Sequence, residues 1–172
     1  MELLGNRTYK KTCLAIGEFS IAWALFENVR CNKSFNAGLE ILPDMGMTNE
    51  ELVQSALRLK YLLLEDQARI RQATNQELSV VERLLLRQNE KHYLQPIQDF
   101  LSRENFSEKD IVACVYIGAR FRNNLLHGEK NIQLLNGQIE MFKELTTFFT
   151  LIIQHGGIKV RKKDNNASVL GG

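Results

Sequence analysis

Large apolar residues recur along the chain at the spacing of an α-helix. The clearest stretch is residues 8–30, where an apolar side chain at every third or fourth position draws one stripe along the helix. The stripe consists of Ile16, Phe19, Trp23 and Phe26, and it continues to Arg30. Because an apolar stripe of this kind is stable only when buried, this helix is predicted to form one wall of the core.

Two further helices begin at recognisable capping residues. Thr48 followed by Glu51 fits a capping box and predicts a helix from there to about residue 71. Ser107 followed by Asp110 predicts another helix, which Gly128 is placed to end. The residues predicted to face inward from these two helices are Leu52, Ala56, Leu59, Leu63, Ile111, Cys114, Val115, Gly118, Phe121 and Leu125.

The segments between these helices have weaker patterns. Residues 31–47 have the composition of a loop. A helical segment is predicted from residue 74 or 75 to about residue 89, and a shorter one over residues 92–102 with Pro96 in its first turn. The inward positions predicted for the first of these segments are Leu78, Val81, Leu85 and Leu86.

The end of the chain divides into a helix and a polar tail. The helix is predicted over residues 137–154, and Gly156 with Gly157 stops it. No repeat and no strand pattern stands out anywhere in the sequence. We therefore predict one all-α domain over residues 1–155, a bundle of about four to six helices, followed by a flexible basic and polar tail over residues 156–172.

Composition and charge exclude several classes of protein. The net charge is +2, from 22 basic and 20 acidic residues, which excludes a DNA-coating protein held by bulk charge. The sequence contains no metal-binding cysteine pattern and none of the E-x-x-H pairs of a di-iron bundle, so we expect no metal and no cofactor. Cys13 and Cys114 are predicted to be small buried thiols. No window approaches about 18 uninterrupted apolar residues, and the start of the chain lacks the apolar core of a signal peptide. The protein is predicted to be cytoplasmic, without contact to a membrane.

Polar groups crowd one otherwise apolar helix end, and they are the candidate site. Asn123 and His127 are four residues apart, so they share a helix face and the amide is placed to orient the imidazole. Arg122 lies about a quarter-turn aside, within reach of an anion next to His127. We take these three as candidate catalytic residues, and Arg120, Asn124 and Lys130 as weaker candidates for substrate binding.

This combination suits the cleavage of a phosphodiester without a metal. A histidine moves protons near neutral pH. An arginine holds a phosphate and the additional negative charge that its oxygens gain in the transition state. If the nucleophile is the 2′-hydroxyl of the substrate, the substrate is RNA. A structural interpretation stays open, since His, Arg and Asn are all common at helix C-termini, where a positive charge also complements the helix dipole.

The order Arg122-Asn123-x-x-x-His127 resembles the R-x(4–6)-H motif of HEPN domains, and the following Gly128-Glu129-Lys130 resembles the stretch found in many members. The layout is also similar, with long helices first, the motif at the end of a late helix and one more helix after it. The resemblance implies a helical bundle that pairs about a two-fold axis, so that the motifs of a homodimer meet in a shared cleft.

The resemblance further implies a metal-independent endoribonuclease of a toxin–antitoxin or antiphage system, with an antitoxin or defence partner protein. His127 would then be the acid/base group, Arg122 would engage the scissile phosphate, and Asn123 would orient them. Glu129 departs from HEPN toxins that carry a tyrosine at this position for modification by their antitoxin. The alternative function is a non-catalytic HEPN module that binds nucleotide, RNA or a partner protein; a third is a structural helical subunit.

Overall fold

The structure is a computed structural model that describes residues 7–36, 38–75, 77, 79–84, 86–126 and 135–163. Its elements in chain order are α1 (Arg7–Arg30), β1 (Leu39–Pro43), α2 (Glu50–Thr74), α3 (Val80–Arg83), the 3₁₀-helix η2 (Gln88–Tyr93), α4 (Leu94–Ser102), α5 (Lys109–Leu126), α7 (Ile139–His155) and β2 (Ile158–Lys162). The chain is mainly helical, so the prediction of an all-α bundle is confirmed, with one small sheet in addition. Among the described residues, no helix has both the length and the apolar character needed to cross a membrane.

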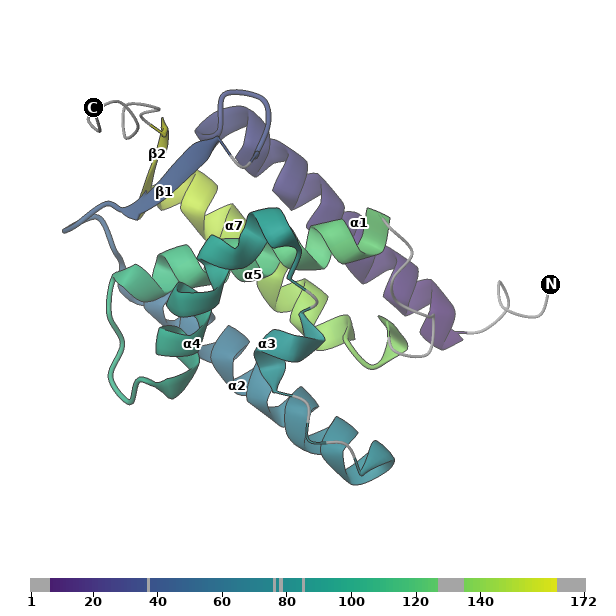
Figure 1. The fold of residues 1–172 in the computed structure, drawn as a ribbon. Coiled ribbons are helices and arrows are strands. Elements are labelled where there is room, and N and C mark those ends of the chain that lie inside the picture. Colours follow the sequence, from purple (N-terminus) through teal and green to yellow (C-terminus); the bar gives the residue numbers. More distant parts are fainter. Residues whose placement is uncertain are drawn as a thin grey trace.

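The long helices are arranged around α5. Helix α7 packs against α1 on one side and α2 on the other, while α5 contacts both α1 and α2 and is covered by α4 (Figure 1). Every residue from 110 to 121 is buried, so this part of α5 has no solvent-facing side. A helix that is buried all round is the central element of a core. Because α5 is packed on all sides, the residues at its C-terminal end are held in a fixed position.

Close packing fixes where α5 crosses α7. A Cβ atom added at Gly118 would lie 2.3 Å from the Phe149 ring, so only a glycine allows the two helices to approach this closely. Arg30, at the end of the predicted stripe of α1, donates hydrogen bonds at 2.9 Å to the backbone oxygens of Ile152 and Ile153. These contacts satisfy carbonyl groups in the last turn of α7.

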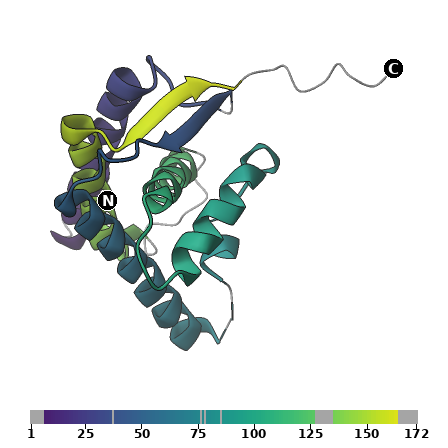
Figure 2. The ribbon, with the colours of Figure 1, turned by 90° about the vertical axis from the view of Figure 1, so that its left-hand side faces the viewer.

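The structure contains two short strands, although no strand pattern stands out in the sequence. β1 and β2 form an antiparallel pair, with Leu39 opposite Lys162 and Pro43 opposite Ile158 (Figure 2). The predicted flexible tail therefore begins too early, because residues 158–162 are a strand, whereas residues 164–172 lie outside the described residues. Each strand has five residues and one buried side chain, Ile41 or Ile158, and so short an alternation is not distinguishable in a sequence.

The middle of the chain differs from the prediction in its helix ends. Asn49 caps α2 in place of Thr48, because its side-chain oxygen accepts the Leu52 N–H at 2.8 Å. Helix α2 continues to Thr74 and ends at Asn75, which has a left-handed backbone, so no helix begins there. The next helix, α3, begins after Ser79. Val80 in this helix and Leu84 just after it are buried, and the predicted Val81 and Leu86 are partly buried against the core. Leu78 and Leu85 lie outside the described residues.

Candidate functional site

The candidate residues come from the last turns of α5 and from the segment that follows it. Helix α5 carries Arg120, Arg122, Asn123 and Asn124. His127 and Lys130 lie outside the described residues, as does the predicted helix stop at Gly128. Within the described part of the chain, no group of three or more His, Cys, Asp and Glu side chains is placed to hold a metal ion.

Arg120 is a buried anchor, and its predicted contact with a substrate does not fit this position. Its side chain has no exposed surface, its Nε donates to the backbone oxygen of Leu84, and its Nη1 lies 3.1 Å from a carboxylate oxygen of Glu90. Asn124 is also fully buried, and its amide has no hydrogen-bond partner among the described residues. Neither side chain reaches the surface where a substrate would approach.

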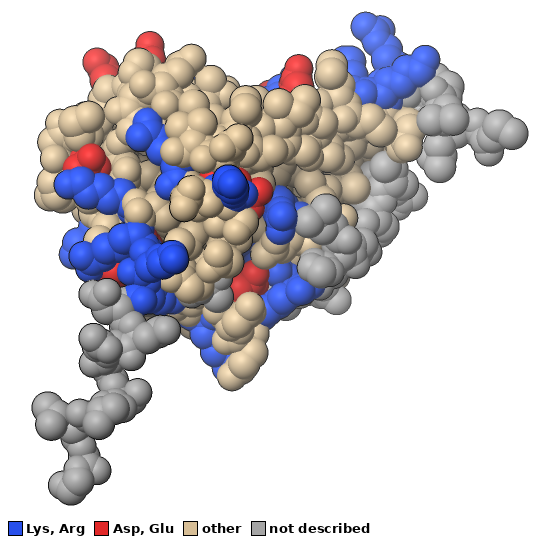
Figure 3. Space-filling view, turned by 90° about the horizontal axis from the view of Figure 1, so that it is seen from above, with Lys and Arg blue, Asp and Glu red and all other residues tan. Residues whose placement is uncertain are grey.

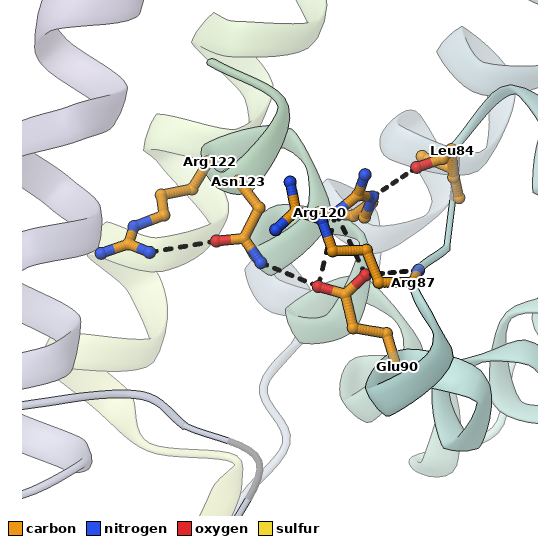
Figure 4. Close-up of polar contacts among 6 residues, drawn as sticks. All are labelled: Leu84, Arg87, Glu90, Arg120, Arg122 and Asn123. Atoms are coloured by element: carbon orange, nitrogen blue, oxygen red, sulfur yellow. Dashed lines mark hydrogen bonds and ion pairs between the residues drawn. The ribbon is translucent and has the colours of Figure 1, made fainter. Parts of the chain in front are cut away.

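Glu90 organises the site, and no sequence pattern singled it out. It is 4% exposed and accepts hydrogen bonds from the Arg120 guanidinium, from Asn123 Nδ2 at 2.8 Å and from the Arg87 backbone N–H at 2.9 Å (Figure 4). A buried carboxylate needs several such partners, because burial removes its hydration. The only local signal is its position in the first turn of η2, where an acidic residue is common at a helix N-terminus.

Asn123 links this buried pair to the surface. While its Nδ2 donates to Glu90, its Oδ1 accepts a hydrogen bond from Arg122 Nη1 at 3.0 Å (Figure 4). The amide thus orients Arg122, one of the two groups that the sequence predicts it to orient; the other, His127, lies outside the described residues. The result is a polar chain that runs from the fully buried Arg120, through Glu90 and Asn123, to the half-buried Arg122.

The Arg122 side chain is partly exposed to solvent although it contacts both Asn123 and Glu27. Its side chain is 38% exposed, and its Nη2 lies 4.0 Å from Oε1 of Glu27 on α1. At this separation and exposure the ion pair is weak. An arriving phosphate can therefore compete with Glu27 for the guanidinium, because a bidentate Arg–phosphate contact is stronger than a long, solvated ion pair.

A small pocket of about 240 Å³ lies beside Arg122. Its lining combines aromatic rings with side-chain amides and one charge of each sign: Trp23, Phe35, Tyr93, Asn36, Asn89, Asn123, Glu90 and Arg122. The Trp23 indole N–H is buried and has no hydrogen-bond partner among the described residues. Burial and the charge of Glu90 raise the pKa of the Tyr93 hydroxyl, so it stays protonated at neutral pH.

The cysteines do not add a nucleophile to this site. Cys31 and Cys114 are buried, and burial raises the pKa of both thiols, that of Cys31 to about 12. A thiol with so high a pKa carries almost no reactive thiolate at neutral pH. Cys13 is exposed, contrary to the prediction that it is buried, because it lies on the outer side of α1.

A comparison of the chain with protein-family models, with curated proteins and with solved structures finds no match in any of the three.

Proposed function

We propose that the protein is a metal-independent endoribonuclease in which Arg122 holds the scissile phosphate and His127 moves the protons. The observation that carries the proposal is the fixed position of Arg122 at a pocket edge, through Asn123 and the buried Glu90–Arg120 pair. A guanidinium that is oriented before the substrate arrives stabilises developing negative charge without the cost of reorganisation.

The proposed reaction is an internal displacement at phosphorus. His127 accepts the proton of the 2′-hydroxyl, and this oxygen forms a bond to phosphorus while the bond from phosphorus to the 5′-oxygen breaks. The leaving 5′-oxygen takes up a proton from a second acid. Arg122 binds the non-bridging oxygens, whose charge increases in the transition state. The products are a 2′,3′-cyclic phosphate and a 5′-hydroxyl end.

The test is an incubation of the purified protein with a mixed RNA in the presence of EDTA, followed by analysis of the product ends. We expect cleavage at an undiminished rate, with 2′,3′-cyclic phosphates on the 5′ fragments. Cleavage that requires added Mg²⁺ would contradict the mechanism. If folded protein leaves the RNA intact but binds it, the non-catalytic HEPN module is the better description. The resemblance to HEPN proteins extends the proposal to a toxin–antitoxin or antiphage defence system with a partner protein.

The proposal includes a homodimer, and an unusual surface of α1 supports it. Leu14, Ile21, Leu25 and Val29 are between 50 and 64% exposed and share one face of this 24-residue helix. Uncharged side chains cover much of the molecule as seen from above, with Lys and Arg spread among them and most crowded at the left of the view (Figure 3). A row of large exposed apolar side chains marks a surface that another molecule covers.

A second copy of this chain fits this face of α1. If two α1 helices cross antiparallel with their Ile21 side chains at the centre, Leu25 of each copy faces Gly17 of the other. Gly17 has open space around it, so it leaves room for the larger side chain. Trp23 and Glu27, which border the candidate site, lie on the opposite side of α1 from this face, so the helix separates the second copy from the site.

Replacing Ile21 with glutamate is expected to convert the dimer to a monomer. The added carboxylates would meet at the centre of the interface, where like charges and desolvation both oppose association. Light scattering at micromolar protein concentration measures the mass directly. The matched control is Tyr61→Glu, since Tyr61 is 63% exposed on α2 and its variant should stay dimeric. A monomeric wild type, or an Ile21→Glu variant with the mass of a dimer, would remove this part of the proposal.

A further inference from the structure

We infer that the pocket beside Arg122 holds one unstacked base of a single-stranded RNA. The inference rests on the proposed function, and it adds the class of substrate and the residues that recognise it. Arg122 takes the phosphate of the nucleotide at the pocket edge, and the base of the same nucleotide enters between the aromatic and amide side chains.

The size of the pocket favours one small planar group. Its volume of about 240 Å³ is below the roughly 300–1,000 Å³ of pockets for drug-sized ligands. A base inside a duplex is stacked and paired, so it enters such a pocket only after it is turned out, and this costs least in a single strand or a loop. The pocket therefore selects unpaired RNA.

The walls match the two kinds of surface that a base presents. Trp23 and Tyr93 are buried, and Phe35 packs edge-on against the Trp23 ring with 5.4 Å between the ring centroids. Phe35 is half-buried and is the ring whose surface a base can contact, whereas Trp23 and Tyr93 have little accessible surface and pack behind the pocket wall. The three rings belong to three segments distant in sequence, namely α1, the loop after it and η2, which is why no pattern in the sequence indicates them together.

Unused hydrogen-bonding groups are placed for the edge of a base. The Trp23 N–H has no partner among the described residues, but it is fully buried behind the pocket wall and does not meet a ligand there, so the available groups come from two asparagines. Asn89 is exposed at the pocket, and its side-chain amide makes no hydrogen bond to a described residue. Asn36 uses its Oδ1 to accept the Gly38 N–H at 2.9 Å, so its amide NH₂ stays available. Donors and an acceptor together suit a base edge better than an apolar ligand.

Charge decides which part of the nucleotide enters. Glu90 lies in the lining and is fully engaged by its own partners, and Glu27 lies near the guanidinium of Arg122. These carboxylates repel a phosphate from the interior, whereas a neutral base meets no such repulsion. The phosphate consequently stays at the exposed side of Arg122.

The test uses Trp23, the single tryptophan of the chain, as a fluorescent reporter behind the pocket wall. Wild-type protein is titrated with AMP, GMP, CMP and UMP, and with ribose 5-phosphate and inorganic phosphate as ligands without a base. We expect at least one nucleotide to change the Trp23 emission in a saturable way and both base-free ligands to leave it unchanged. A single-stranded RNA should displace that nucleotide more effectively than a hairpin stem of the same sequence.

The variant that tests the inference is Asn89→Ala, because the side-chain amide of Asn89 has no hydrogen-bond partner among the described residues and its loss should leave the fold intact. Removing its hydrogen bonds should weaken nucleotide binding by roughly tenfold. Asn105→Ala, at an exposed amide outside the pocket, is the matched control and should bind like wild type. Asn89→Asp is a second variant of the same shape, which should weaken binding at least as much because it removes the NH₂ donor and adds a charge beside Glu90.

The result that overturns the inference is an unchanged Trp23 emission with all four nucleotides, or equal binding by Asn89→Ala and Asn105→Ala. The proposed function is judged separately, by RNA cleavage. Cleavage without base binding contradicts only the pocket assignment. Base binding without cleavage supports the pocket and contradicts the nuclease.

Discussion

Replacing His127 with alanine is expected to lower the rate of RNA cleavage by about 10²–10⁴-fold, the usual contribution of a general acid or base. Arg122→Ala should cause a loss of about 10²–10³-fold, as expected for a group that stabilises charge in the transition state. Because both residues act in the same step, the double variant should be little worse than the His127 variant. The measurement is the initial rate on a labelled single-stranded RNA with EDTA present.

Two comparisons separate catalysis from folding in this experiment. His155→Ala removes an exposed histidine at the end of α7 and should retain wild-type activity. Arg122→Lys keeps the charge but loses the planar fork, so its activity should lie between those of wild type and Arg122→Ala. The Arg122 side chain is 38% exposed, so its variants should unfold near the wild-type temperature. Wild-type cleavage by a folded His127→Ala variant would contradict the assignment of this residue.

The long helices could be predicted because their signals are local. The apolar stripe of residues 16–26 gives α1, and the repeated pattern of residues 139–152 gives α7 within two residues of its observed ends. The caps were less reliable, since Thr48 and Asn49 are adjacent and both are good caps, and only the backbone geometry decides between them. Local competition of this kind shifts a helix end without changing the fold.

Contacts between distant segments could not be predicted from one sequence. β1 and β2 are separated by more than a hundred residues, and neither strand is long enough to show an alternating pattern. The residues of the candidate site likewise fall into those that a local sequence signal indicates and those that it does not. Arg122 and Asn123 stand out in the sequence because they are polar residues at the end of an apolar helix, whereas Glu90 belongs to an ordinary polar run. Only the tertiary structure shows that Arg120 points inward to Glu90 while Arg122 points to the pocket.

Glu90→Ala is expected to be the most destabilising single change near the site. It leaves the guanidinium of Arg120, which is 0% exposed, as a buried charge without its carboxylate partner. Breaking a buried ion pair by removing one partner costs about 3–5 kcal/mol of the free energy of unfolding. The matched control is Glu77→Ala, because Glu77 pairs with Arg71 on the surface, where the loss should stay below about 1 kcal/mol. Urea unfolding followed by circular dichroism measures both values.

A double variant distinguishes two causes of the expected destabilisation, namely the loss of the ion-pair partner of Arg120 and the loss of side-chain volume at position 90. Replacing the pair with apolar residues of similar size, as in Arg120→Met with Glu90→Leu, removes the uncompensated charge and should recover part of the stability. It cannot restore activity, however, because Asn123 no longer has the carboxylate that holds its Nδ2, and Arg122 then loses its fixed orientation. A stable double variant with reduced cleavage would therefore show that Glu90 positions Arg122 in addition to supporting the fold. Full wild-type cleavage by this variant would instead limit Glu90 to a structural role.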